Sequence, residues 1–332
     1  QAGLGQTLSS AASTDAAATT TTDTGIAAAL DDFFNAFQGL ASNPTDSGAR
    51  QALFSSANIL ADRLQQADAT LSQAQADLDA QVNGNVTTAN GLLQTVADLN
   101  SQIVRIEANA PGSAVDLRDQ RQEALEKLSA LLPVTVTDAG DGAVQVAAAD
   151  GGGSPVVLVD HGTVTGPVAF TGTTVTAGAT ATVLGLSSGS MQGAIDARDG
   201  TLQTLRDQLD QLAGQMVGSV NALYNPSGST GDFFTASGTT AGTFSVDGSL
   251  TAAGLRAGAG GAAGDNSVAR AIAALANTKF STAGGQLIDG TMGGFFAGSV
   301  AQFGQALSSV NSSVSNQGTI AALVRGQRDS VR

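Results

Sequence analysis

The feature that most constrains this chain is a long repeat of small and apolar residues, spaced alternately four and three positions apart. This spacing lines one face of a helix and is typical of helices that pack side by side. The repeat begins at Leu53, takes one extra step of four to Val82, and has a single polar member, Asn85. Its members are Leu53, Ala57, Leu60, Leu64, Ala67, Leu71, Ala74, Leu78, Val82, Asn85, Ala89, Leu92, Val96, Leu99, Ile103 and Ile106.

The repeat predicts one helix of about 60 residues, with Ser47 as its cap and its end near Ala108. At 1.5 Å per residue this helix would be roughly 90 Å long. The extra step of four is a stutter, which locally unwinds a supercoil, and it coincides with the helix-weakening residues 83–85. Pro111 and Gly112 then end the helix.

Three further segments show the same spacing, which predicts helices with matching apolar faces. Such faces satisfy one another by packing into an elongated, coiled-coil-like helical bundle, and a compact globular bundle is the alternative. The segments comprise Ile26, Leu30, Phe33, Phe37 and Leu40; Met191, Ile195, Arg198, Leu202, Leu205, Leu209, Leu212, Met216, Ser219 and Leu223; and Phe296, Val300, Phe303, Leu307, Val310, Val314, Gln317, Ala321 and Val324.

Between the helical segments, residues 133–186 change to short alternating runs rich in Val, Thr and Gly, with turn pairs at Asp141-Gly142 and His161-Gly162. This pattern predicts an inserted β-rich domain, so the expected fold class is α+β. A second Gly-rich stretch lacks the spacing of a phosphate-binding loop and is predicted to form loops with short strands. The predicted parts are a polar lead-in (1–25), bundle segments (26–132, 187–224 and 265–332), the β domain (133–186) and the loops (225–264).

A cluster of charged residues between Ala114 and Val136 raises the question of an active site. Ser113 and Asp116 are predicted to cap a helix, Glu123 and Lys127 to form an i,i+4 pair, and Pro133 to end the helix. Arg118 and Arg121 alternate with Asp116 and Asp119, and would hold both carboxylates ionised, so the site would lack an acid. The helix would bury Leu117, Leu125, Leu128 and Leu132. The cluster is therefore interpreted as the polar face of a helix.

The composition excludes most of the other side chains that enzymes commonly use for catalysis. The chain has no Cys and one His, which excludes thiolate zinc sites, disulfides, Cys nucleophiles and paired His ligands. That residue, His161, is predicted to lie at the surface after a strand. The net charge of −14 argues against nucleic acid or an anionic membrane as a partner, and no apolar run approaches the length of a membrane span. No catalytic residue, metal ligand or cofactor is predicted.

Several separated segments resemble, in matching order, the family of the first hook-associated protein of the bacterial flagellum. They include "LDDFFNAFQGLASNPTDSGARQALFSSANILADRL", the Asp-Leu-x-Asp-Gln-Arg run at 116–121, "GSMQGAIDARDGTLQTLRDQLDQLAGQMVGSVNALYN", "GDNSVARAIAALANTKF" and "VRGQRDSVR". The terminal segments of the family are missing at both ends. The chain therefore looks like a core fragment.

This resemblance implies a structural subunit that joins hook to filament, secreted to the extracellular flagellum and without enzymatic activity. It implies copies of the same chain in a ring as partners, together with the hook protein, the second junction protein and a type III export chaperone. Two alternatives stay open. One is a different flagellar axial protein, such as the second junction protein, the cap or a flagellin, although the 116–121 run argues against it; the other is an enzyme or adhesin on a helical stalk.

Overall fold

A computed structural model describes residues 25–260, 262, 264–309 and 312. The chain divides into two compact units: unit 1 comprises Gln1–Ala74 and Thr201–Arg332, and unit 2 comprises Gln75–Gly200. Helix α3 (Ser47–Glu107) contributes its first part to unit 1 and the rest to unit 2. The predicted lead-in lies, apart from Gly25, outside the described residues, as do the apolar positions from Val310 onward.

Helix α3 confirms the long helix predicted from the apolar repeat. It has 61 residues and ends at Glu107, one residue before the predicted Ala108. The predicted cap was wrong by one position. Asp46 lies just before the helix, and its Oδ1 accepts the backbone N–H of Gly48 at 2.9 Å, whereas Ser47 is the first helical residue.

The buried face of α3 departs from the predicted repeat after the stutter. Leu93 is fully buried where Leu92 was expected, and Ile106 is 51% exposed. The reason is a second step of four, from Val82 to Val86, which keeps the buried face closer to the period of a straight helix. From there the 4–3 alternation continues through Val86, Ala89, Leu93, Val96, Asn100, Ile103 and Glu107, all of which are buried. Two polar residues therefore lie on the interior face.

Unit 1 has an aromatic core. Helix α2 (Ile26–Ser42) buries all five members of its predicted apolar repeat, which confirms that part of the prediction. The ring centroid of Phe33 lies 5.1 Å from that of Phe37 and 5.8 Å from that of Phe233, and both pairs are edge-to-face. Tyr224 and Phe244 extend the cluster. Such ring pairs add to the stabilisation that comes from burial of their surface.

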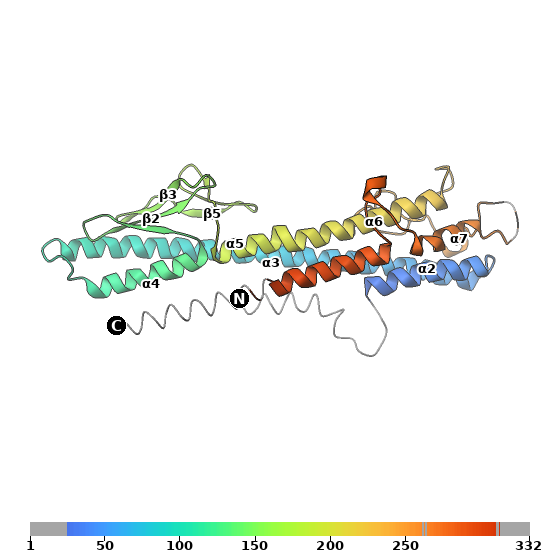
Figure 1. Ribbon diagram of the computed structural model, residues 1–332, viewed down its shortest axis with the longest axis horizontal. Coiled ribbons are helices and arrows are strands. Elements are labelled where there is room, and N and C mark those ends of the chain that lie inside the picture. The colour runs from blue at the N-terminus through green and yellow to red at the C-terminus, as the bar shows by residue number, and fades with distance from the viewer. Residues whose placement is uncertain (1–24, 261, 263, 310–311, 313–332) are drawn as a thin grey trace, which may run out of the picture. The chain divides into compact units, whose positions relative to one another are not determined.

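Among its described residues, unit 1 also contains α6 (Gln203–Tyr224), α7 (Ser267–Ala274) and a helical segment at 292–309 (Figure 1). Three short 3-10 turns are Ala252–Gly254, Leu275–Asn277 and Thr282–Gly284. On the predicted face of α6, Leu209, Leu212 and Met216 are buried and Leu205 is half-buried. Towards the end of the helix, Val220 and Tyr224 are buried in place of Leu223. In the 292–309 segment, Phe296 and Phe303 are buried as predicted. Val300, predicted on the same face, is exposed.

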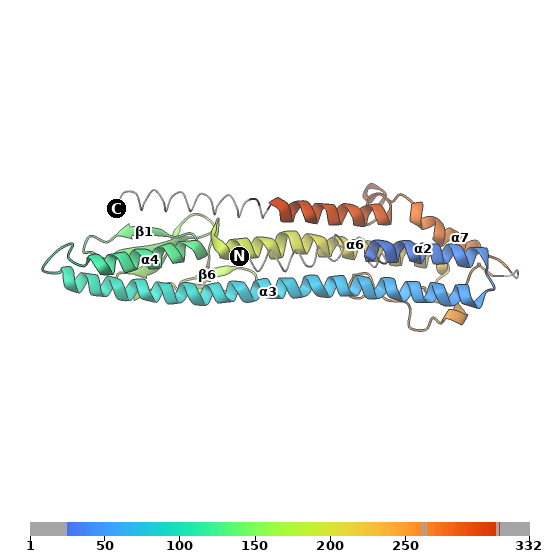
Figure 2. The same cartoon turned by 90° about the horizontal axis from the view of Figure 1, so that it is seen from below.

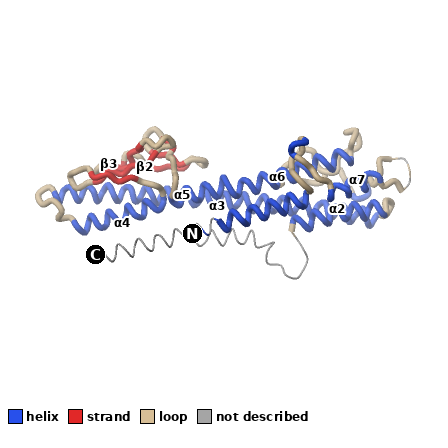
Figure 3. Tube along the Cα trace, viewed as in Figure 1, coloured by secondary structure: helices blue, strands red, loops and turns tan. Residues whose placement is uncertain are grey.

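Unit 2 combines helices with two antiparallel sheets. Helix α4 (Val115–Leu131) follows α3 and lies beside it in both views (Figures 1 and 2). Helix α5 (Gly189–Asp196) continues into a π-helical turn, Ala197–Leu202. The strands lie over α3 and α4 in Figure 3. This combination confirms the α+β fold class.

The first sheet has the order β1-β2-β3-β4 and the second the order β5-β6-β7, with every neighbouring pair antiparallel. A register shift between Val146 and Ala147 interrupts the β2–β3 pairing. The strands are β1 (Thr135–Asp138), β2 (Val144–Ala149), β3 (Pro155–Asp160), β4 (Thr163–Val164), β5 (Val168–Phe170), β6 (Val175–Ala177) and β7 (Thr182–Val183).

All seven strands lie between residues 133 and 186, but they share unit 2 with α4, α5 and part of α3. The six-part division of the chain and the elongated form of the bundle therefore stay predictions. Among the described residues, no helix is both long and apolar enough to span a membrane.

Candidate functional site

Asn100 occupies the interior face of α3 and holds the first sheet. Its side chain is fully buried, and its Nδ2 donates to the carbonyls of Val144 at 2.8 Å and of His161 at 2.7 Å. Its Oδ1 accepts the N–H of Val144 at 3.2 Å and Nη1 of Arg121 at 2.8 Å. The amide thus pairs with Val144 as a neighbouring strand would, and all of its hydrogen-bonding capacity is used.

Arg121, on α4, is buried instead of lying on the exposed polar face that the sequence predicted. Only 6% of the residue is exposed, and its Nη1 donates to Gly142 O at 2.8 Å as well as to Asn100. Burial lowers the pKa of its guanidinium, and the nearby charge of Arg118 adds to this effect. The guanidinium therefore ties α4 to α3 and to the β1–β2 turn.

Arg118 pairs with Glu107 at the end of α3, a partner that the sequence analysis did not name. Its Nε donates to Oε1 at 2.8 Å and its Nη2 to Oε2 at 2.5 Å, a two-pronged geometry that suits a guanidinium and a carboxylate. The hydrogen bond from Arg118 and those from the backbone of Ala114 and Gly112 lower the pKa of Glu107 to about 2. Glu107 is therefore ionised at neutral pH.

The start of α4 also differs from its prediction. Ala114 takes the cap position, and its N–H donates to Oε1 of Glu107 at 3.2 Å, while Ser113 makes no capping hydrogen bond from its side chain. The predicted pair of Glu123 and Lys127 is confirmed at 2.7 Å. Leu125, Leu128 and Leu132 are buried as predicted, and Leu117 is half-buried.

The turn that meets this cluster requires glycine. Gly142 has a φ of 93°, in the left-handed region that other residues avoid. A Cβ at this position would lie 2.8 Å from Oε2 of Glu107 and 3.2 Å from Cγ2 of Ile103. The β1–β2 turn thus fits closely against α3. Together, Asn100, Glu107, Arg118 and Arg121 are called the α3–α4 network.

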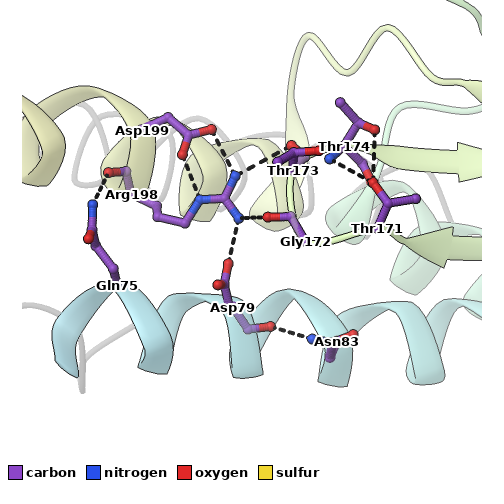
Figure 4. Close-up of polar contacts among 9 residues, drawn as sticks. All are labelled: Gln75, Asp79, Asn83, Thr171, Gly172, Thr173, Thr174, Arg198 and Asp199. Carbon is purple, nitrogen blue, oxygen red and sulfur yellow. Dashed lines mark hydrogen bonds and ion pairs between the residues drawn. The ribbon is translucent and has the colours of Figure 1, made fainter. Parts of the chain in front are cut away.

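A second cluster, drawn in Figure 4, is centred on Arg198 in the π-helical turn. The guanidinium donates to Oδ1 of Asp79 at 2.5 Å, to both carboxylate oxygens of Asp199, and to the carbonyl of Gly172 at 2.7 Å. It also lies 5.4 Å from the ring centroid of Phe170. The carboxylates, that of Asp199 first, raise the pKa of Arg198, and Arg198 lowers the pKa of Asp199.

Arg198 therefore connects α3 to the β5–β6 turn. Its own carbonyl accepts Nε2 of Gln75 at 3.2 Å, so backbone and side chain both contact α3 (Figure 4). Asn90 repeats the role of Asn100, because its amide exchanges two hydrogen bonds of 2.8 Å with the backbone of Val168 on β5. The sequence placed Arg198 in a polar slot of a helical repeat, which agrees with its burial, but it did not indicate the partners of the guanidinium.

The single histidine lies at the surface, as predicted. The side chain of His161 is 52% exposed, and its Nδ1 lies 2.7 Å from Oδ1 of Asp160. Within the part of the chain that the structure describes, no group of three or more His, Asp or Glu side chains is arranged to hold a metal ion. The absence of catalytic and cofactor residues stays a prediction.

In the α3–α4 network and the Arg198 cluster, polar side chains hold helices and sheets together through hydrogen bonds within the chain. Residues 12–234 match the model of the family described as flagellar hook-associated protein FlgK helical domain. Because this match covers more than half of its 332 residues, the chain belongs to that family.

The relatives bear the same name. The chain is 28% identical over 228 residues to flagellar hook-associated protein 1 of Salmonella typhimurium, covering 63% of this chain and 40% of that protein. The corresponding protein of Bacillus subtilis is 29% identical over 133 residues, covering 40% and 26%. A solved structure, that of the flagellar hook junction protein FlgK from Burkholderia pseudomallei, matches 66% of this chain and 42% of its own, with 30% identity and a TM-score of 0.52. The chain thus spans less than half the length of each relative.

Proposed function

We propose that this chain is part of a structural subunit that joins the hook of the bacterial flagellum to its filament. The observation that carries the proposal is the family match over residues 12–234, which includes all of α3, the α3–α4 network and the Arg198 cluster. The name of the Burkholderia protein, a flagellar hook junction protein, supports the same role. The shared region is less than half of each relative, so the role of the whole protein is inferred from them.

The packing of unit 2 suits a structural domain that transmits force, and not a catalytic domain. Asn90 and Asn100 fix one sheet each to α3, and Arg198 fixes the β5–β6 turn to the same helix. These polar atoms are engaged within the chain and are not free to activate a substrate. We therefore infer that the protein is not an enzyme and requires no cofactor.

The partners follow from an adaptor role. Copies of the chain would form a ring through extended interfaces, with the hook protein on one side and the second junction protein on the other. A type III export chaperone would accompany the subunit before its secretion to the extracellular flagellum. The charge of −14 disfavours nucleic acid and anionic membranes as further partners.

Immunogold electron microscopy of flagella from the source cells tests this function, with antibody raised against the chain and cells lacking its gene as the control. A single band of label at the boundary of hook and filament is expected. Label along the filament or at its tip would indicate another axial protein. Label on the cell body alone would contradict a flagellar role.

A further inference from the structure

Helices α5 and α6 are joined by the π-helical turn Ala197–Leu202, called here the π turn, without a break in the helical backbone. Ala197 has φ −65° and ψ −42°, and Leu202 has φ −70° and ψ −42°, which are ordinary values for a right-handed helix. A π turn closes its hydrogen bonds over five residues instead of four, is rare, and occurs frequently at functional sites. The helix therefore contains a local irregularity.

The residue in the middle of the π turn weakens it further. Gly200 is exposed, and its φ does not lie in the left-handed region. A Cβ at this position would meet no atom within 4 Å, so neither packing nor backbone conformation requires glycine here. Glycine weakens a helix relative to alanine, because it loses more conformational freedom when the chain folds. The π turn thus combines an unusual hydrogen-bond pattern with a flexible residue.

Polar contacts of a single residue, Arg198, hold the π turn in place. Arg198 is the only buried residue from 197 to 201, with 7% of its surface exposed. Its guanidinium donates to Oδ1 of Asp79 on α3 and to the carbonyl of Gly172, and its own carbonyl accepts Nε2 of Gln75 (Figure 4). Hydrogen bonds weaken steeply once their geometry is lost. The π turn is therefore fixed only while these few bonds are intact.

We propose that the π turn is a hinge in the helix formed by α5 and α6, and that the Arg198 cluster keeps this hinge closed. A hinge consists of a few residues that absorb changes of φ and ψ, and small residues such as Gly200 are common in hinges. Loss of the ion pair with Asp79 opens the hinge while α5 and α6 stay folded. Only the use of the hinge rests on the proposed function, in which one subunit fits two different assemblies.

Hydrogen exchange of the full natural protein, measured at single amides, tests the proposal. We expect amides of residues 198–203 to exchange about tenfold faster than those of residues 207–216 in α6. Asp79→Asn removes one charge partner of Arg198 and should accelerate exchange in the π turn about tenfold further. Gly200→Ala should slow exchange there about fivefold, because alanine favours the helix.

Two matched variants serve as controls. Asp62→Asn changes an exposed aspartate of the same helix, α3. Gly193→Ala changes an exposed glycine of α5 at which a Cβ would also meet no atom within 4 Å. Neither control should alter exchange in the π turn.

Equal exchange in the π turn and in residues 207–216 would overturn the proposal, as would rates in the π turn that Asp79→Asn and Gly200→Ala leave unchanged. Faster exchange throughout α5 and α6 in Asp79→Asn would also overturn it, because the ion pair would then stabilise the fold in general. The measurement uses purified protein and does not depend on assembly. Immunogold localisation tests the junction role separately, so a correctly placed subunit with a rigid π turn would refute only the hinge.

Discussion

At the scale of single residues, Asn100 carries the largest set of buried hydrogen bonds in the α3–α4 network. The substitution Asn100→Ala would remove four of them and leave the backbone of Val144 and the guanidinium of Arg121 without these partners. Because a buried polar group without its partner costs about 1 to 3 kcal/mol, we expect the free energy of unfolding to fall by about 3 kcal/mol or more. Urea unfolding followed by circular dichroism measures the change.

Asn83→Ala is the matched control on the same helix. Asn83 is exposed, and the one hydrogen bond recorded for its side chain goes to the carbonyl of Asp79 within the helix. Its loss should change the free energy of unfolding by no more than about 0.5 kcal/mol. Equal losses in the two variants would show that the network contributes nothing.

The depressed pKa of Glu107 predicts a dependence of stability on pH. Its folded pKa of about 2 lies below the ordinary value of 4.5, so the ionised form is favoured by folding. This contribution is fully present above pH 4.5 and is lost as the pH falls towards 2. We therefore expect Glu107→Gln to be less stable than the natural chain at pH 7 and the difference to shrink at pH 3, as measured by urea unfolding at each pH.

Glu123→Gln provides the comparison for this experiment. Glu123 pairs with Lys127, but both side chains are largely exposed. Exposed ion pairs contribute little, so this variant should track the natural chain at both values of pH. A constant difference between Glu107→Gln and the natural chain would mean that the ion pair with Arg118 does not depress the pKa of Glu107.

Gly142 and Gly140 lie in the same turn, and alanine substitutions at the two positions distinguish the cost of backbone strain from the cost of a close contact. Both have positive φ, but a Cβ at Gly142 would meet Glu107 at 2.8 Å, whereas nothing lies within 4 Å of one at Gly140. Substitution by Ala should strain the backbone at both positions. We expect Gly142→Ala to cost about 1 kcal/mol more than Gly140→Ala, because the Glu107 pair must shift. Equal costs in thermal unfolding would argue against a tight fit.

At the scale of elements, Arg198 decides how firmly the β5–β6 turn is held to α3. Its guanidinium contacts Asp79 on the helix and the carbonyls of Gly172 and Thr173 in the turn. Arg198→Lys keeps the charge but loses the planar fork. We expect backbone amides of residues 168–177 to exchange with deuterium about tenfold faster in this variant, while β2 is unaffected.

Arg63→Lys is the control for this exchange experiment. Arg63 donates to the side chain of Gln66 one turn away on α3, at an exposed site. Its substitution should leave exchange in both sheets unchanged. Faster exchange across all strands in Arg198→Lys would indicate general destabilisation instead of the release of one turn.

At the scale of the whole molecule, the charge of −14 should oppose association of copies. Because salt shortens the range of repulsion to about 10 Å at 0.1 M, self-association of the purified chain should increase with salt. Sedimentation velocity at low and high salt measures this. Association that decreases with salt would contradict this expectation and point to a contact between opposite charges.

The sequence by itself determined the elements that depend on short-range periodicity. The 4–3 spacing predicted α3 and the buried face of α2, and the alternating runs predicted strands within 133–186. These patterns are readable because a helix or a strand repeats its geometry every few residues. The spacing of four residues along a helix likewise predicted the ion pair of Glu123 and Lys127.

Only the tertiary structure decided which polar residues became buried. Asn100, Glu107 and Arg121 are as polar as any surface residue, and a search for apolar repeats passes over them. Arg198 stood within such a repeat, but the repeat did not indicate its partners. Asn100 meets Val144 across 44 positions of sequence, and Arg198 meets Asp79 across 119. Burial of a polar group is tolerated only where such a distant partner satisfies it. The partners exist only once the chain has folded, so the networks that hold unit 2 together follow from its packing.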